Sequence, residues 1–438
     1  MKKVLIIGGG ASGITAAIAA AKNGAAVTIL EHMDRIGKKI LSTGNGKCNY
    51  TNRRQDLSCY RGENPAFVLP VLKQFGFEET VAFFRGLGIY PKERDGYFYP
   101  ASEQAAAVLD VLRMELRRLG VQVVTGCEVT AVRKKRNRFE VAVKCKKTED
   151  FEAATVRKKG NDFEIASERK LFCADSCIFA CGGKAFPKSG SDGSAFGLIE
   201  KFGHSFVGLV PALVQLKAKQ TFFKSIAGVR TDCLVKLFVE RKLVCEDRGE
   251  VQLTDSGISG IPVFQVSRYA ARALQDRKRV QAVLDFVPYL EETELYAELK
   301  RRFFKGNGKT AEEALVGLFS KKLIPLFLKQ NEIGLQEDAG RIRERKIMEL
   351  CGYLKAFTVD IADTKGFAAA QASAGGVRTE EICAETMESK LVDGLYFAGE
   401  VVDIDGICGG YNLQWAWASG YVAGMHAAET ARKCCHNV

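Results

Sequence analysis

The sequence is poor in residues and runs that several large classes of protein require. Only 4 of its 438 residues are histidine, which argues against a hydrolase built on a catalytic histidine. Beyond the N-terminus, no run approaches the roughly 18 apolar residues of a membrane helix. The 14 cysteines show no regular disulfide framework. We therefore expect a soluble, cytoplasmic protein with reduced thiols, no membrane span and no metal.

Two segments imitate other classes of protein. Two lysines before a mainly apolar stretch at 4–21 resemble a signal peptide, but glycines at 8–10 interrupt it. Cysteines 173, 177 and 181 recur every fourth residue, as a ligand set can, yet no histidine or carboxylate clearly completes them. A buried strand at 175–180 explains these cysteines better, because buried thiols behave as small apolar groups.

The formal net charge of +12 could serve nucleic acid, a membrane surface, or an anionic cofactor and substrate. The basic runs 133–138 and 157–159 border strand-like segments and contain no recognisable nucleic-acid module. We interpret them as solvated hairpin tips and expect no nucleic-acid partner. The oligomeric state is not defined by the sequence.

The N-terminal residues have the pattern of a dinucleotide-binding unit. An apolar strand at 4–7 leads into Gly8-Gly9-Gly10-Ala11-Ser12-Gly13, which matches G-x-G-x-x-G. Gly8 permits the tight turn, Gly10 lets a pyrophosphate approach the backbone, and Gly13 lets the helix at 14–23 pack on the strand. Glu31 ends the next strand, where a carboxylate can bind an adenosine ribose. A glycine turn without a ligand is the weaker alternative.

Further glycine-rich segments favour FAD over NAD as the resident cofactor. Residues 35–49 expose backbone that can cradle phosphates or lie against a planar ring, although a plain surface loop has the same composition. A strand at 395–398 ends in Gly399 and Glu400, which can bind ribityl hydroxyls, and a helix at 413–428 can stabilise negative charge on a reduced flavin. No second G-x-G-x-x-G provides a separate nicotinamide domain, which argues against a disulfide reductase.

Several longer segments together resemble one family: GKKILSTGNGKCNYTN (37–52), ACGGKAFPKSGSDG (180–193), LTDSGISG (253–260), ASAGGV (372–377) and TMESKLVDGLYFAGEVVDIDGICGGYNLQWAWASG (386–420). It is the BaiN/aminoacetone-oxidase family of bacterial FAD-binding flavoproteins, and the resemblance spans the chain in order. The resemblance implies an α/β fold, in which a Rossmann-like, glutathione-reductase-type FAD-binding domain carries an inserted β-barrel-like domain and a small helical domain. Where this chain has Gly44-Asn45-Gly46-Lys47 and Ala180-Cys181-Gly182-Gly183, the family often has Gly-Gly-Gly-Arg and Ala-Thr-Gly-Gly.

We predict a discontinuous FAD-binding domain at 1–193 and 366–438, a β-rich inserted domain at 194–289 and 354–365, and a helical insertion at 290–353. Helices are expected at 66–75, 78–87, 102–120 and 263–274, and strands at 234–240, 243–246 and 251–254. The segment AVRKKRNRFEVAVK (131–144) is echoed by TVRKKGNDFEIASE (155–168), which predicts a duplicated hairpin.

The residues and the resemblance predict a cofactor site and three catalytic candidates. Cys48 could act near the flavin, although a small packing residue is the stronger interpretation; Asp405 and Tyr411 could move a proton or only bind flavin. Predicted cofactor contacts are Gly8, Gly10, Ala11, Ser12, Gly13, Glu31, Lys38, Lys39, Ser42, Gly44, Asn45, Gly46, Asn49, Val129, Ala180, Gly182, Gly183, Gly399, Glu400, Asp405, Gly410, Tyr411, Asn412 and Leu413.

We expect an FAD-dependent oxidoreductase that acts on a small organic molecule. The resemblance implies hydride transfer with NAD(P)H as donor, as in an enone or steroid reductase, or alternatively an amine oxidase that uses oxygen. A flavin-binding or regulatory protein without turnover fits the same glycine segments, because they encode binding rather than chemistry. An RNA-modifying flavoenzyme is a third alternative, which draws on the positive charge.

Overall fold

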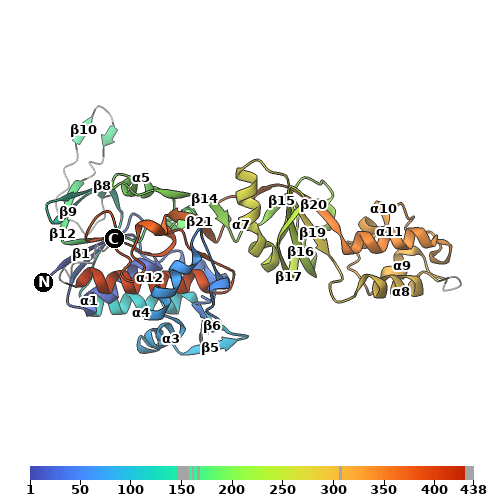
Figure 1. Cartoon of the computed structure of the whole chain (residues 1–438), viewed down its shortest axis with the longest axis horizontal. Helices are drawn as coiled ribbons and strands as arrows, with labels where there is room; N and C mark the ends of the chain where they lie inside the picture. Colours follow the sequence, from blue (N-terminus) through green and yellow to red (C-terminus); the bar gives the residue numbers. More distant parts are fainter. Residues whose placement is uncertain (146–156, 160–161, 165–167, 305–307, 430–438) are drawn as a thin grey trace. The chain divides into compact units, whose positions relative to one another are not determined.

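The computed structural model describes residues 1–145, 157–159, 162–164, 168–304 and 308–429. The chain divides into two compact units, of which the first comprises Met1–Leu209 and Ala372–Val438 and the second Val210–Gln371 (Figure 1). Each unit has its own hydrophobic core. Among the described helices, none is both long and apolar enough to cross a membrane.

A five-stranded parallel sheet forms the centre of the first unit, in the order β22-β13-β1-β2-β7. Its strands are β1 (Lys3–Ile7), β2 (Ala26–Leu30), β7 (Gln122–Val124), β13 (Ser176–Phe179) and β22 (Leu395–Phe397). Strand β13 places Cys177 in the core, as expected from its apolar sequence, whereas Cys173 is exposed. The order brings strands from the beginning, middle and end of the chain side by side, and this confirms the predicted Rossmann-like fold.

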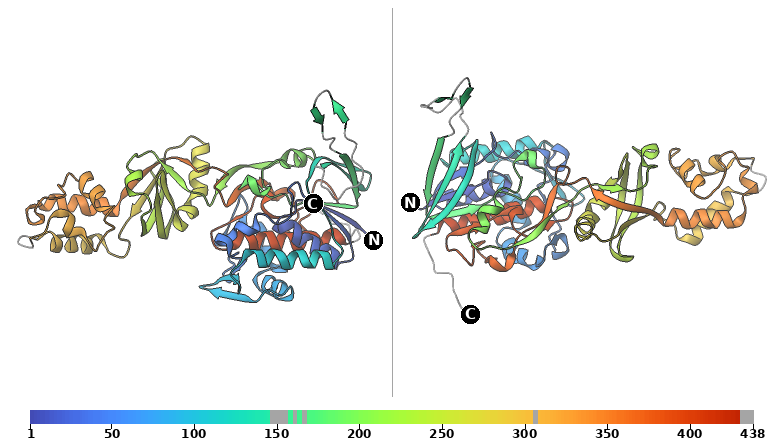
Figure 2. Two further views of the ribbon diagram at one scale, coloured as in Figure 1. Left: turned by 180° about the vertical axis from the view of Figure 1, so that it is seen from behind. Right: turned by 90° about the horizontal axis from the view of Figure 1, so that it is seen from above.

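Helices α1 (Ala11–Lys22) and α12 (Tyr411–Ala428) pack against each other at backbone distance (Figures 1 and 2). A Cβ added at Gly420 would lie 2.4 Å from the carbonyl oxygen of Ser12, and one added at Gly424 would lie 2.1 Å from that of Ala16. Alanines on α1 and glycines on α12 therefore permit an approach that larger side chains would prevent. The two ends of the chain are joined through this contact.

The expected helix at 66–75 is divided into a 3-10 turn, η3 (Pro65–Phe67), and α2 (Val68–Gln74). Pro70 lies in the first turn of α2, where its missing N–H breaks no helical hydrogen bond. The expected helix at 102–120 is α4 (Ala105–Arg118). The remaining helices of this unit are α3 (Phe77–Gly86) and α5 (Phe196–Glu200), and the remaining 3-10 turns are η1 (Ile40–Gly46), η2 (Leu57–Cys59), η4 (Pro187–Ser189), η6 (Thr379–Glu381) and η7 (Gly399–Val401).

A three-stranded antiparallel meander of β8 (Cys127–Lys135), β9 (Arg138–Cys145) and β12 (Glu168–Ala174) adjoins the sheet. The first copy of the predicted hairpin is formed by β8 and β9. In the second copy, β10 (Arg157–Lys159) pairs with β11 (Asp162–Glu164), and its turn at 160–161 lies outside the described residues. Cys127 and Cys145 face each other across β8 and β9 and form a disulfide, so the expectation of fully reduced thiols is wrong.

The other strands of the first unit are short: β3 (Thr51–Asn52), β4 (Tyr60–Arg61), β5 (Pro91–Arg94), β6 (Tyr97–Pro100), β21 (Ala372–Val377) and β23 (Asp405–Gly406). Strand β14 (Phe206–Ala212) runs across the boundary between the units. Strand β23 pairs with β4, so that Asp405 lies opposite Arg61.

A closed six-stranded barrel forms the core of the second unit, which confirms the predicted barrel-like insertion. In order around the barrel, its strands are β15 (Leu216–Ala218), β18 (Gly257–Gly260), β17 (Lys242–Thr254), β16 (Arg230–Val239), β19 (Val280–Asp285) and β20 (Phe357–Thr364). The expected separate strands 243–246 and 251–254 are one continuous β17, because its residues from Lys242 to Gln252 pair with β16 across both expected strands and the gap between them. Helices α6 (Phe223–Ile226) and α7 (Ile261–Gln275) belong to the same unit.

The expected helical segment after residue 290 consists of four helices and a 3-10 turn: α8 (Glu292–Arg302), α9 (Ala311–Leu315), α10 (Ile324–Gln330), η5 (Ala339–Arg341) and α11 (Glu344–Lys355). Lys355 and Asp285 link α11 to the barrel strand β19 through an ion pair of 2.6 Å. Lys355 also donates to the carbonyl of Leu290 (2.7 Å). The ion pair therefore holds a helix and the barrel of this unit together.

Candidate flavin site

The glycine turn between β1 and α1 has the geometry that its sequence predicts. Gly8 has a φ of +104°, and a Cβ there would lie 2.5 Å from the carbonyl oxygen of Ala180 at the end of β13. A Cβ at Gly13 would lie 1.9 Å from the carbonyl oxygen of Gly8. By contrast, a Cβ at Gly10 would meet no atom within 4 Å. The turn is thus tightly packed at Gly8 and Gly13, whereas the backbone at Gly10, at the N-terminus of α1, leaves space for a phosphate.

Glu31 closes onto this turn from the end of β2. Its carboxylate is buried and accepts hydrogen bonds from the amides of Gly9 (2.8 Å) and Met33 (2.8 Å). The carbonyl of Glu31 accepts from the amide of Cys127, which anchors the start of β8 beside it. Val129, two residues further along β8, is half-buried against the core of this unit. A carboxylate fixed in this way keeps lone pairs that can accept from ribose hydroxyls.

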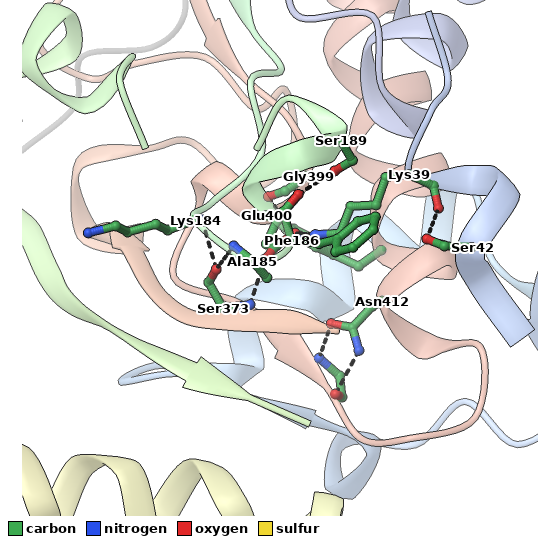
Figure 3. Close-up of polar contacts among 12 residues, drawn as sticks. Lys39, Ser42, Lys184, Ala185, Phe186, Ser189, Ser373, Gly399, Glu400 and Asn412 are labelled. Carbon is green, nitrogen blue, oxygen red and sulfur yellow. Dashed lines mark hydrogen bonds and ion pairs between the residues drawn. The ribbon is translucent and has the colours of Figure 1, made fainter. Parts of the chain in front are cut away.

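A second polar assembly joins four segments that are separated in the sequence (Figure 3). The Nζ of Lys39 lies 2.6 Å from Oε2 of Glu400, while Oε1 of Glu400 accepts from the amide of Ser373 (2.5 Å). The Oγ of Ser373 in turn accepts from the amides of Lys184 (2.8 Å) and Ala185 (2.9 Å). A Cβ at Gly183 would lie 2.7 Å from that Oγ, so glycine is required there.

The loop at 40–49 and the start of α12 form a third part of the site. Ser42, Gly44, Asn45 and Gly46 are exposed, and the hydroxyl of Ser42 donates to the carbonyl of Lys39 (2.8 Å). Lys38 instead forms an ion pair with Asp34 on the surface.

Asn49 connects this loop to the N-cap of α12. Its Oδ1 would lie 2.9 Å from a Cβ at Gly410, whose φ is +94°. Asn412, in the first turn of α12, donates to the carbonyl of Gly406 (2.8 Å) and accepts from its amide (2.9 Å). Tyr411 is buried beside Asn412, and Leu413 is half-buried.

The residues present fit a dinucleotide that carries a flavin. The open backbone at Gly10 suits a pyrophosphate, and Lys39 supplies a cation on the same unit. Two buried side-chain oxygens, Asn49 Oδ1 and Ser191 Oγ, have no hydrogen-bond partner within the described part of the chain. Buried polar atoms are normally satisfied, so both are suited to bonds with a ligand.

The three catalytic candidates differ in their surroundings. Cys48 is fully buried, and this burial raises the pKa of its thiol to about 12, so that it remains a protonated packing residue. Tyr411 is also buried, and burial followed by contact with Cys59 raises its pKa well above the ordinary value. Its hydroxyl therefore keeps its proton at neutral pH. Asp405 is buried on β23, opposite Arg61.

Sequence reasoning missed Ser373 and Phe186. Ser373 lies in the ASAGGV segment, which carried the family resemblance without indicating a role, and its partners are 188 and 189 residues away. Phe186 lies in the glycine-bounded loop after β13 and has a left-handed backbone, with φ +55°. Only the flanking glycines, at 183 and 190, signalled that this loop was unusual.

The parallel sheet, the glycine turn with its acid and the distant Lys39–Glu400 assembly define an FAD-dependent oxidoreductase of the Rossmann type. The family described as "HI0933-like protein Rossmann domain" matches residues 2–156 and 148–426. The chain belongs to this family, which confirms the expectation from its motifs.

Several bacterial relatives match nearly the whole chain. The chain is 47% identical, over 98% of its length and all of the relative's, to "3-dehydro-bile acid delta(4,6)-reductase" of Clostridium scindens. It is 28% identical, over 96% of its length and 97% of the relative's, to "Ribosomal RNA dihydrouridine synthase" of Haemophilus influenzae. Among solved structures, a 3-ketosteroid-delta4-(5alpha)-dehydrogenase from Rhodococcus jostii is 16% identical, with a TM-score of 0.48 over 98% of this chain and 97% of that one.

Proposed function

We propose that this protein reduces a carbon–carbon double bond conjugated to a carbonyl group in a small organic molecule, with NAD(P)H as electron donor. The observation that carries the proposal is the 47% identity, over the full length, to a protein named as a bile-acid delta(4,6)-reductase. The name of the more distant relative also describes the reduction of a ring double bond next to a carbonyl. A common reaction type with different substrates would account for both names.

FAD is proposed to lie along the site described above. The pyrophosphate would bind at the N-terminus of α1, the adenosine ribose at Glu31, and the ribityl chain near Lys39 and Glu400. The start of α12, at Asn412, would supply backbone N–H groups and a helix dipole worth about 0.3–1 kcal/mol toward negative charge. We propose that the other residues predicted from the sequence as cofactor contacts also bind FAD.

When bound, FAD supplies the means of passing a hydride from NAD(P)H to the substrate. The reduced substrate also needs one proton, so that it gains two hydrogen atoms in all. Tyr411, buried at the start of α12, is the candidate donor of that proton, because its hydroxyl is protonated at neutral pH; its raised pKa makes it a weak acid, which would give up the proton only to a strongly basic enolate formed by hydride addition to the substrate. Cys48 is not needed for this step.

Anaerobic stopped-flow measurements test the proposal. NADH or NADPH should bleach the flavin absorbance, and an enone steroid acid should restore it, with a product heavier by two hydrogen atoms. Reduction by amines together with reoxidation only by oxygen would instead identify an amine oxidase. A flavin that no nicotinamide and no amine reduces would indicate binding without turnover.

Two variants separate binding from proton transfer. Glu31→Ala should weaken FAD retention, because it leaves the amides of Gly9 and Met33 without acceptors, at about 1–3 kcal/mol each. Glu31→Gln keeps one side-chain oxygen as an acceptor and should therefore lose less FAD affinity than Glu31→Ala. Tyr411→Phe should leave flavin reduction by NAD(P)H unchanged but slow reoxidation by the enone about 100-fold or more. Unchanged reoxidation would remove Tyr411 from the mechanism.

RNA is the second candidate substrate, favoured by the name of the more distant relative and by the net charge of +12. A basic groove of about 810 Å³ is lined by residues 131–135, 201–202 and 391–393. Within it, Lys134 already donates to the carbonyl of Asp393 (2.7 Å), and Lys135 pairs with Glu140 (2.9 Å). We therefore expect weak RNA binding; tight retention that falls steeply with salt, together with dihydrouridine formation, would reverse this choice.

The proposed setting is the cytoplasm, where reduced nicotinamide is available.

The three-part division into 1–193 with 366–438, 194–289 with 354–365, and 290–353 also remains a proposal, which limited proteolysis would test.

A further inference from the structure

Phe186 has a conformation that its side chain disfavours. Its φ of +55° and ψ of +63° lie in the left-handed region, where a bulky residue is strained. The ring is half-buried, yet it is not among the side chains packed in either hydrophobic core of the described residues. Neither packing in a hydrophobic core nor backbone preference therefore explains why an aromatic residue stands at this position, and strained residues of this kind cluster at ligand sites.

Hydrogen bonds from both sides fix this conformation. Immediately before Phe186, the amides of Lys184 and Ala185 both donate to the Oγ of Ser373 (2.8 and 2.9 Å). Immediately after it, the amide and the hydroxyl of Ser189 donate to the carbonyl of Phe186 (2.9 and 2.8 Å). The loop therefore fixes the backbone of Phe186, and with it the direction in which the ring leaves the chain, at the expense of backbone strain.

The same hydrogen bonds connect the ring to the proposed cofactor site. Ser373, which holds the loop, also donates its amide to Glu400, the partner of Lys39. Figure 3 draws Phe186 at this junction, together with the Lys39–Glu400 pair and Ser373. A flat apolar ring on a rigid loop beside an ion pair suits a ligand that is both planar and polar.

We propose that the ring of Phe186 packs directly against the bound flavin and that Ser373 acts as the positioning residue that holds it there. The inference rests on the proposed FAD site and adds to it an aromatic contact that the glycine motifs do not provide. Planar rings attract one another beyond their simple burial, and a preorganised ring loses little freedom on binding. The strained backbone of Phe186 would then be offset by the contact between its ring and the flavin.

The dissociation constant of FAD, measured by titration of the apoprotein, provides the first test. Phe186→Ala should raise it about tenfold or more, and Phe186→Leu should raise it less. Phe196→Ala is the matched control, because that ring is also partly buried but packs against the core and against Phe206, with 5.3 Å between the ring centroids. It should lower the unfolding midpoint but leave FAD affinity nearly unchanged. Equal affinities for wild type and Phe186→Ala would overturn the proposal.

A double-mutant cycle tests the positioning role of Ser373. Ser373→Ala should weaken FAD binding severalfold in the wild type but have little further effect in Phe186→Ala, since both act through one ring. Additive effects would show that Ser373 acts independently. Phe186→Gly should weaken FAD binding without lowering the unfolding midpoint of the apoprotein, because glycine accepts the left-handed backbone. A lowered midpoint with unchanged affinity would instead identify Phe186 as a structural residue.

Flavin fluorescence gives a readout that a structural role would not change. An indole in contact with the flavin quenches its emission, so Phe186→Trp should shorten the emission lifetime, whereas Phe196→Trp should not. A wild type that binds no FAD would refute the proposed function itself. A wild type that binds FAD, with Phe186 variants that behave like it, would refute only this inference.

Discussion

The close contact between α1 and α12 predicts an unusual response to alanine. In a helix interior, replacing glycine by alanine normally stabilises by about 1 kcal/mol. At Gly424, however, the new Cβ would lie 2.1 Å from the carbonyl oxygen of Ala16 and 2.8 Å from its Cα. These are backbone atoms, so no rotamer change can relieve the clash, and the helices must move apart. Overpacking usually costs about 1–3 kcal/mol; because the clash here is with backbone atoms, we take the upper end, about 3 kcal/mol, which leaves a net loss of about 2 kcal/mol after the gain in helix propensity.

We therefore expect Gly424→Ala to lower the free energy of unfolding of the first unit by about 2 kcal/mol and its midpoint by about 5 °C. Both tryptophans of the chain, Trp415 and Trp417, are buried in α12, so tryptophan fluorescence, excited selectively over tyrosine, reports on this unit alone. Gly352→Ala is the matched control: it lies inside α11, a Cβ there meets no atom within 4 Å, and it should stabilise the second unit slightly. An unchanged or raised fluorescence midpoint for Gly424→Ala would refute the reasoning.

Three further predictions concern charge and redox state. Lys355→Met should destabilise the second unit by about 3 kcal/mol, the lower end of the cost of removing one partner of a buried ion pair, because Asp285 would be left buried without its counter-charge; circular dichroism on unfolding should show partial recovery when Asp285→Asn is added. Burial lowers the pKa of His204, so its contribution to stability is present above its unfolded pKa of about 6.5 and is lost as the pH falls below that value. Urea midpoints measured by tryptophan fluorescence should thus fall more steeply below pH 6.5 in wild type than in His204→Gln, and parallel profiles would contradict this. Mass spectrometry after alkylation without reductant should find Cys127 and Cys145 joined; two alkylated thiols there would contradict the pairing.

The parts of the structure that sequence reasoning anticipated are those encoded locally. Gly8, Gly13 and Glu31 could be assigned because a strand, a tight turn and a helix within about 30 residues leave few alternatives. The partners of Ser373 could not be assigned in the same way, since they lie 188 and 189 residues away and depend on how β21 meets the loop after β13. The disulfide was missed for a related reason: it depends on the register that places Cys127 opposite Cys145, which cysteine spacing alone does not reveal.

The scarcity of histidine argued against a histidine-based hydrolase, yet the first unit contains a serine, a histidine and an acid in hydrogen-bonded order. The Nε2 of His204 lies 2.8 Å from the Oγ of Ser389, and its Nδ1 lies 2.8 Å from Oε2 of Glu381. The Oγ of Ser389 also accepts from the amides of Leu391 (3.0 Å) and Val392 (2.9 Å), so both of its lone pairs are occupied. Its hydroxyl proton remains for Nε2, and Nδ1–H then donates to Glu381. Because the His204 side chain is fully buried and the serine oxygen already has its acceptor positions filled, this group can fasten the 389–392 turn to His204 and to η6 but cannot attack a substrate. Geometry alone therefore does not make a catalytic triad, because the oxygen of Ser389 that would act as nucleophile is already fully hydrogen-bonded.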